Sequence, residues 1–205
     1  MINYSKQNIN QDDIDAVIEV LKSDFLTQGP KVPEFENALR DYCSVNYAKV
    51  VSNATAALHL AYLAIGLKKG DVVWTSPNTY VATANAALYC GAEVDFVDID
   101  VRTYNMSVSS LEAKLQQAKK DKKLPKLVVP VHFSGQSCEM KDIWKLSQEY
   151  GFKIIEDASH ALGAEYLGKK VGCCEYSHMA LFSFHPVKMI TTGEGGAILL
   201  SSERD

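Results

Sequence analysis

This sequence has few cysteines, no long apolar run and only a small net charge. Its five cysteines are odd in number and include no C-x-x-C spacing, which leaves a disulfide framework or a metal site without support. No apolar stretch reaches the roughly 18 residues of a membrane span, and the N-terminal "MINYSKQNINQDD" lacks the apolar centre of a signal peptide. We therefore expect a cytoplasmic protein with no metal and no membrane partner.

The charge balance narrows the class of ligand. The 205 residues carry 21 Lys and Arg against 25 Asp and Glu, a net charge of −4, so there is no general basic field to attract nucleic acid. With 47% hydrophobic and 22% charged residues, the chain can bury a sizeable core as one domain or as a large part of a bigger one. We expect a small-molecule ligand and no nucleic acid.

The hydrophobic pattern changes near residue 48. Apolar residues at helical spacing predict amphipathic helices over 10–23 and 33–43, with "LTQGP" between them. Strands are then expected over 48–51, 71–76, 93–100, 126–133, 152–158, 179–184 and 196–200, with helices over 54–66, 81–91, 107–119 and 139–150. This alternation predicts an α/β fold, a three-layer αβα sandwich with a mostly parallel sheet covered on both faces.

Polar groups follow the predicted strand ends, where open parallel sheets bind their ligands. Lys188 lies between the apolar runs "MALFSF" and "GAILL", and the alternative interpretation is a solvated loop lysine. The segment "SNATAAL" opens a helix directly after a strand, so its free backbone N–H groups can hold an anion, with Ser183 as a further donor. The alternative for this segment is simple N-capping by Asn53 or Thr55.

Asp157 closes the apolar run "KIIED", and His160 follows three residues later. A carboxylate fixed at this point strengthens the charge on a cationic ring nitrogen that faces it, unless Asp157 instead caps a short helix starting at Ala158. His160 reaches the same side if the chain turns helically, and is otherwise a hydrogen-bonded structural histidine. An anion-binding helix start, a carboxylate and a lysine are what pyridoxal phosphate requires for its phosphate, pyridine nitrogen and aldehyde.

Several segments resemble one known family across nearly the whole chain. They are "LTQGP", "VVSNATAALHLA", "SPNTYVATANAALYCGAEVDFVDID", "VPVHFSGQ", "IIEDASHALGAEYLGKKVG" and "FSFHPVKMITTGEGGAI", of which the last two are highly specific. They are similar to the DegT/StrS-type nucleotide-sugar aminotransferases of the fold-type I pyridoxal-phosphate superfamily. The resemblance implies that Lys188 bonds to the cofactor aldehyde and that Asp157 pairs with the pyridinium nitrogen, both as catalytic residues.

The same resemblance implies roles for further residues. Ala54, Thr55 and Ser183 are expected to hold the cofactor phosphate.

Around the ring, the family pattern implies that Tyr80 stacks on its face. His160 and Gln136 are expected beside the ring, and His185 near the substrate. For Tyr80 the alternative is a core aromatic next to "VATANAAL".

The implied reaction is amino transfer from glutamate to a 4-keto nucleotide sugar. The resemblance is greatest to members that aminate C4 of a UDP-linked 4-keto-6-deoxy-N-acetylhexosamine on the way to pseudaminic acid, in bacterial surface-glycan biosynthesis. A relative that removes a hydroxyl carries histidine at the position of Lys188, so the lysine favours transamination. The family also implies a homodimer.

The resemblance also bears on domain organisation. Residues 1–205 are expected to form the pyridoxal-phosphate-binding large domain, with an N-terminal helical arm up to about residue 30. Family members are nearly twice as long, so the small C-terminal domain is expected to be absent. The alternative function is therefore a catalytically incomplete fragment or pseudoenzyme. A nicotinamide-dependent dehydrogenase is disfavoured because no G-x-G-x-x-G follows the first strand of the alternating region.

Overall fold

The computed structural model describes residues 5–201, so the segments 1–4 and 202–205, which include the chain end discussed above, lie outside the described residues. A seven-stranded sheet forms the centre, in the order β1-β9-β8-β5-β4-β2-β3. Its strands are β1 (Tyr47–Val51), β2 (Val72–Thr75), β3 (Glu93–Phe96), β4 (Leu127–Val129), β5 (Lys153–Asp157), β8 (Met179–Ser183) and β9 (Gly196–Leu200).

Only β9 runs against the common direction of the sheet. It pairs antiparallel with β1 on one side and β8 on the other, while the pairs β8–β5, β5–β4, β4–β2 and β2–β3 are parallel. The mostly parallel sheet is thereby confirmed. Because β1 and β8 share the direction of the other parallel strands, the carboxyl ends of six of the seven strands lie at one edge.

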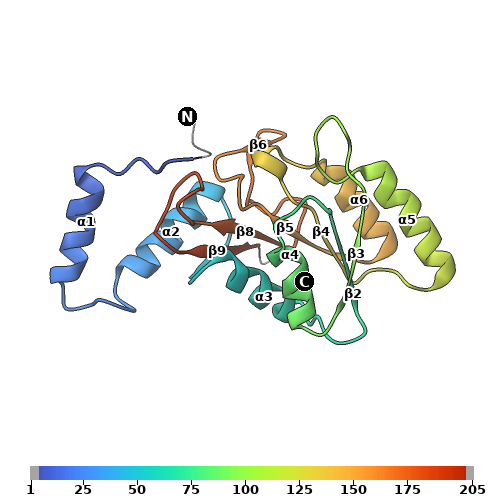
Figure 1. Cartoon of the computed structure of the whole chain (residues 1–205), viewed down its shortest axis with the longest axis horizontal. Coiled ribbons are helices and arrows are strands. Elements are labelled where there is room, and N and C mark those ends of the chain that lie inside the picture. The colour runs from blue at the N-terminus through green and yellow to red at the C-terminus, as the bar shows by residue number, and fades with distance from the viewer. Residues whose placement is uncertain (1–4, 202–205) are drawn as a thin grey trace.

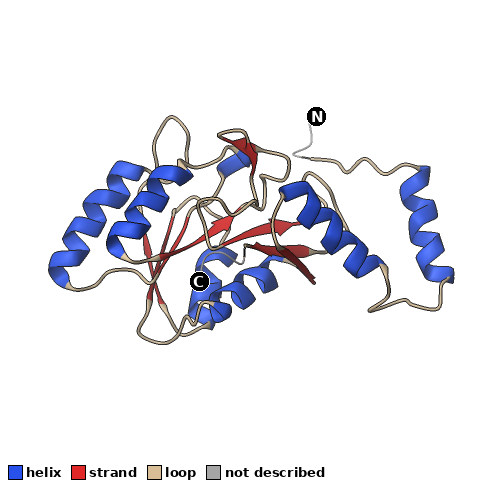
Figure 2. Ribbon diagram, turned by 180° about the vertical axis from the view of Figure 1, so that it is seen from behind, coloured by secondary structure: helices blue, strands red, loops and turns tan. Residues whose placement is uncertain are grey.

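Helices cover both faces of the sheet, which confirms the three-layer α/β architecture (Figures 1 and 2). On one face α3 (Ala54–Ala64) and α4 (Ala82–Tyr89) pack through fully buried alanines, whose small side chains let both helices lie close to the strands. On the other face lie α2 (Lys31–Cys43), α5 (Val108–Asp121) and α6 (Met140–Tyr150). The sheet is therefore apolar on both sides, as continuous apolar strands require.

Helix α1 (Gln11–Lys22) stands apart from these layers in both views (Figures 1 and 2). Its start is fixed by a capping box, in which Asn10 and Asp13 each accept a backbone N–H of the other. None of its residues is buried, although Ile14, Val17 and Leu21 lie at helical spacing. The predicted helix is confirmed, and its apolar face has no partner among the described residues.

Two predicted strands are shorter than expected, and a hairpin was not anticipated. The chain leaves β3 after Phe96, where Asp98 and Asp100 accept the backbone N–H groups of Ile99 and Arg102 and so compete with sheet pairing. β4 stops at Val129 because the next residue is a proline, which has no N–H to donate.

The hairpin consists of β6 (Glu165–Tyr166) and β7 (Lys169–Lys170), joined by two residues with positive φ, Leu167 at 50° and Gly168 at 78°. Positive φ at both central residues is the geometry of a tight two-residue hairpin turn. Among residues 5–201, no helix has the length and apolar character needed to cross a membrane.

Candidate active site

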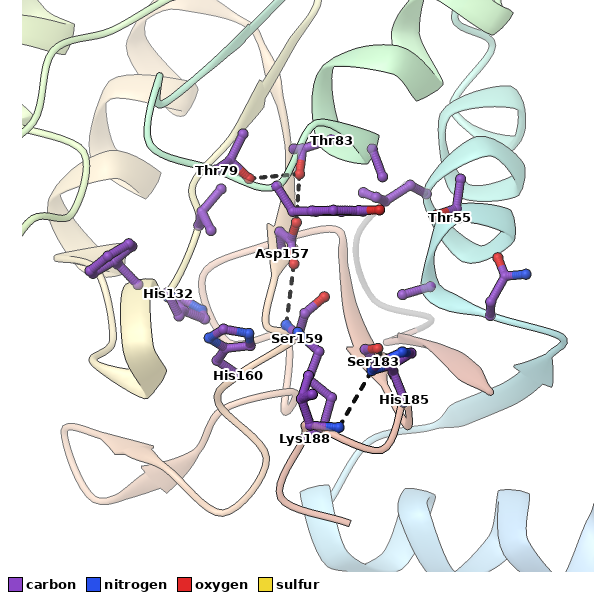
Figure 3. A pocket seen from close by; sticks show the side chains of 18 of the residues that line it. Thr55, Thr79, Thr83, His132, Asp157, Ser159, His160, Ser183, His185 and Lys188 are labelled. Carbon is purple, nitrogen blue, oxygen red and sulfur yellow. Dashed lines mark hydrogen bonds between the residues drawn. The ribbon is translucent and has the colours of Figure 1, made fainter. Parts of the chain in front are cut away.

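A cavity of about 610 Å³ opens where the parallel strands end. Its walls come from the segments that follow β1, β2, β4, β5 and β8, and Figure 3 shows the side chains pointing into it. This is the usual location and size of a ligand site in an open α/β sheet.

The start of α3 forms one wall of the cavity. Asn53 is the N-cap, with its Oδ1 accepting the N–H of Ala56 at 2.8 Å, so the capping interpretation is confirmed for Asn53. This cap leaves the N–H groups of Ala54 and Thr55 at the first turn, where a helix has no internal acceptors for them and where anions bind. Ala54, Thr55 and Ser183 all line the cavity, so the three residues predicted to hold a phosphate are brought together.

A glycine fixes this helix start against the sheet. A Cβ added to Gly196, the first residue of β9, would lie 2.6 Å from the backbone nitrogen of Ala54. Only glycine therefore permits the strand to pass so close to the helix. The contact holds the N-terminal end of α3 beside Ser183, the ladder partner of Gly196.

Asp157 lies in the cavity at the end of β5 and is only 5% exposed. Its Oδ2 accepts a hydrogen bond from Thr83 Oγ1 at 2.7 Å, and its Oδ1 accepts one from the N–H of Ser159 at 3.2 Å. No helix begins at Ala158, so the predicted alternative of a helix cap is wrong, and the carboxylate instead stabilises a turn. Asp157 thus keeps acceptor capacity for a ligand in the cavity.

Lys188 lines the cavity from the loop between β8 and β9, and the residue is half-buried. Burial lowers the pKa of Lys188 from its ordinary value, and the negative charge of Asp157 opposes part of this shift. A neutral amine is therefore more accessible here than on an exposed lysine. Lys188 does lie in a loop, as the alternative interpretation has it, but its side chain is half-buried instead of solvated.

The charges of Lys188 and Asp157 both act on the pKa of His160. Burial, and after it the positive charge of Lys188, lower the pKa of His160, while Asp157 acts in the opposite direction. His160 lines the cavity, as predicted. The cavity therefore brings together the carboxylate of Asp157, the amine of Lys188 and the imidazole of His160, whose neutral form is favoured.

Of the three remaining predicted residues, Tyr80 and His185 line the cavity and Gln136 does not. Tyr80 is 77% exposed at the rim of the cavity, so its interpretation as a core aromatic is wrong. His185 also lines the cavity, and its Nδ1 accepts the N–H of Val187 at 3.4 Å. The structure does not bring Gln136 among the residues that line the cavity. The left-handed backbone of Ser134, with φ of 53°, turns the chain so that Phe133 and Ser134 face the cavity instead.

Two buried side chains that line the cavity were not predicted from the sequence. Thr83, on the first turn of α4, was hidden within an apolar helical pattern. His132 follows β4, and its Nδ1 accepts the N–H of Cys138, so its Nε2 carries the proton and donates to Glu156 at 2.7 Å. Polar residues inside an apolar run were the available signal for both. Within residues 5–201 no cluster of side chains is arranged to hold a metal ion.

Comparisons with known proteins agree on one family. A family model described as the DegT/DnrJ/EryC1/StrS aminotransferase family matches residues 7–205. A UDP-4-amino-4,6-dideoxy-N-acetyl-beta-L-altrosamine transaminase from Campylobacter jejuni strain 81-176 is 50% identical over 203 residues, which are 99% of this chain and 52% of the relative.

Solved structures give the same result. Helicobacter pylori PseC, an aminotransferase involved in the biosynthesis of pseudoaminic acid, superposes with a TM-score of 0.89 at 36% identity, over 98% of this chain and 52% of that one. The PLP form of the putative sugar aminotransferase Spr1654 from Streptococcus pneumoniae gives a TM-score of 0.87 at 28% identity, over 99% and 54%. The chain thus spans about half the length of the relatives it matches.

The lowered pKa of Lys188 predicts an unusual reactivity toward an amine-directed reagent such as acetic anhydride. Because only the neutral amine reacts, the pH midpoint of Lys188 acetylation should lie below the ordinary lysine value of 10.5. Lys170 is the matched control, since its hydrogen bond to Glu165 at 2.7 Å raises its pKa. Peptide mapping by mass spectrometry across pH measures both midpoints. Equal midpoints, or a higher one at Lys188, would contradict the assigned electrostatics.

Proposed function

This chain belongs to the DegT/DnrJ/EryC1/StrS aminotransferase family, and from that premise we propose that it forms the cofactor-binding large domain of a nucleotide-sugar aminotransferase. The cofactor is pyridoxal phosphate, the amino donor is glutamate and the acceptor is a UDP-linked 4-keto-6-deoxy-N-acetylhexosamine. One observation carries the proposal: Lys188, Asp157 and the start of α3 converge on a single cavity. Because both Lys188 and Asp157 are present, nothing in the site favours a pseudoenzyme.

The residues present fit each part of pyridoxal phosphate. The amides of Ala54 and Thr55, with the hydroxyl of Ser183, offer donors for a phosphate. Asp157 offers an acceptor for a protonated pyridine nitrogen, and Lys188 offers an amine whose pKa burial has lowered. A cavity of about 610 Å³ is large enough for the cofactor together with part of a substrate.

When bound, pyridoxal phosphate supplies an aldehyde that takes up the amino group and a protonated ring that accepts electrons. Asp157 would hold the proton on the ring nitrogen, because its buried negative charge favours the cationic form. Lys188 Nζ, once released as a neutral amine, can take the proton from the α-carbon of glutamate and later return a proton to C4 of the sugar. The exposed ring of Tyr80 at the rim is suited to stacking on a flat ligand.

The choice of sugar rests on the relatives. The Campylobacter jejuni relative at 50% identity is named for a 4-amino-4,6-dideoxy-N-acetyl sugar linked to UDP, and pseudaminic-acid biosynthesis is therefore the pathway we propose. The five cysteines are all free thiols, which fits a reducing compartment, and we assign the reaction to the cytoplasm.

We further propose that two copies associate as a homodimer. Large apolar side chains are exposed on the outer surfaces of three helices, among them Leu21 of α1 at 64%, Leu60 of α3 and Leu88 of α4. Exposed apolar side chains of this size mark interaction surfaces, and a second copy of the same chain is the commonest partner. Sedimentation velocity should give twice the mass of the chain; a monomer at micromolar concentration would exclude the dimer.

Loss of the Lys188 amine should abolish amino transfer. With glutamate, pyridoxal phosphate and the UDP-linked keto sugar, the wild-type protein is expected to form a 4-amino sugar, detected by mass spectrometry and NMR. Lys188→Ala should slow this reaction by about 10²–10⁴ or more, because it removes both the attachment point and the base. Lys170→Ala, which removes an amine outside the cavity, should leave the rate unchanged. Wild-type turnover in Lys188→Ala, or no amino sugar from the wild type, would refute the proposed function.

A further inference from the structure

Thr83 is a fully buried threonine whose hydroxyl lies between two polar partners. Its Oγ1 is 2.7 Å from Asp157 Oδ2 and 2.8 Å from Thr79 Oγ1 (Figure 3). Thr79 belongs to the segment after β2, Thr83 to the first turn of α4, and Asp157 to the end of β5. The three side chains thus join neighbouring parts of the cavity wall through one short chain of hydrogen bonds.

The chemistry of the groups fixes the direction of this chain. An ionised carboxylate can only accept hydrogen bonds, and a threonine hydroxyl has a single proton to donate. Thr83 must therefore donate its hydrogen bond to Asp157, and its hydroxyl oxygen accepts a hydrogen bond from Thr79. A hydrogen bond to a charged acceptor is the stronger kind, so the bond to Asp157 dominates the orientation of the Thr83 hydroxyl.

The backbone of Thr83 is also held by a hydrogen bond from helix α3. The hydroxyl of Tyr62, a fully buried residue of α3, donates to the backbone carbonyl of Thr83 at 3.0 Å. Burial, and after it the charge of Asp157, raise the pKa of Tyr62 well above its ordinary value, so this phenol stays a donor. Tyr62 lies about two turns after Ala54 on the same helix, so α3 presents the anion-binding N–H groups at its start and supports Thr83 further along.

We propose that Thr83 is a positioning residue, whose hydroxyl aims the Asp157 carboxylate at the pyridine nitrogen of the cofactor. The inference rests on the proposed function and extends it to a residue that acts on the cofactor through Asp157. Oδ2 is hydrogen-bonded to Thr83 and Oδ1 to Ser159, so these two contacts restrain the orientation of the carboxylate, which lines the cavity. Without the hydroxyl, Oδ2 loses its donor and the carboxylate gains an alternative orientation.

Three variants separate positioning from mere structural support. Thr83→Val keeps the shape of the side chain and removes the donor, whereas Thr83→Ser keeps the donor. Thr75→Val is the matched control, because Thr75 is another fully buried threonine, and its hydroxyl donates to Val129 O at 2.9 Å.

The first readout is the dissociation constant of pyridoxal phosphate, measured by equilibrium dialysis with the absorbance spectrum of the bound form. Thr83→Val should weaken binding about ten-fold, as expected for the loss of a hydrogen bond to a charged group. Thr83→Ser and Thr75→Val should stay within about three-fold of the wild type. An affinity and a spectrum unchanged in Thr83→Val would overturn the proposal.

The second readout needs no cofactor. In urea unfolding, the effects of Thr83→Val and Asp157→Asn should be non-additive, because the two side chains share one hydrogen bond. The pair Thr75→Val and Asp157→Asn should be additive. Additivity for Thr83 and Asp157 would overturn the proposal, whether or not the wild type binds pyridoxal phosphate. A wild type that binds no pyridoxal phosphate would refute the proposed function instead.

Discussion

The buried carboxylate of Asp157 is the fixed point on which the site depends. It lies at the end of β5, in the middle of the sheet, and its two oxygens are held by Thr83 from α4 and by the backbone of Ser159. A buried carboxylate is costly unless it is hydrogen-bonded, so these donors are a condition for placing it there. The charge that results bears on the amine of Lys188 and the imidazole of His160.

Burial and nearby charges together determine the pKa values of Lys188 and His160. For Lys188, the loss of solvation on burial outweighs the attraction of Asp157, so its pKa falls. For His160, burial and the nearby lysine act together against the same carboxylate. Both bases are therefore shifted toward their neutral forms. A neutral amine can take up a proton, as the proposed function requires of Lys188.

Much of this arrangement could be predicted from the sequence, because it follows from the direction of the strands. Apolar strands alternating with helices imply a parallel sheet, and a parallel sheet collects Asn53, Asp157 and Ser183 at one edge. Side-chain contacts between elements could not be predicted. Thr83 occupies one position of an apolar helix, and only the fold, which brings the start of α4 to the end of β5, reveals its partner. Gln136 failed to reach the cavity because a left-handed residue, Ser134, redirects its segment, and residue type alone does not predict that conformation.

The central claim is that Lys188 is the amine that carries the cofactor, and covalent trapping tests it most directly. The protein is incubated with pyridoxal phosphate, reduced with borohydride, digested and analysed by tandem mass spectrometry. We expect one phosphopyridoxyl label on Lys188, and we expect excess inorganic phosphate to slow labelling by competing for the start of α3. A label spread over exposed lysines, or a label on another lysine with Lys188 unmodified, would contradict the account.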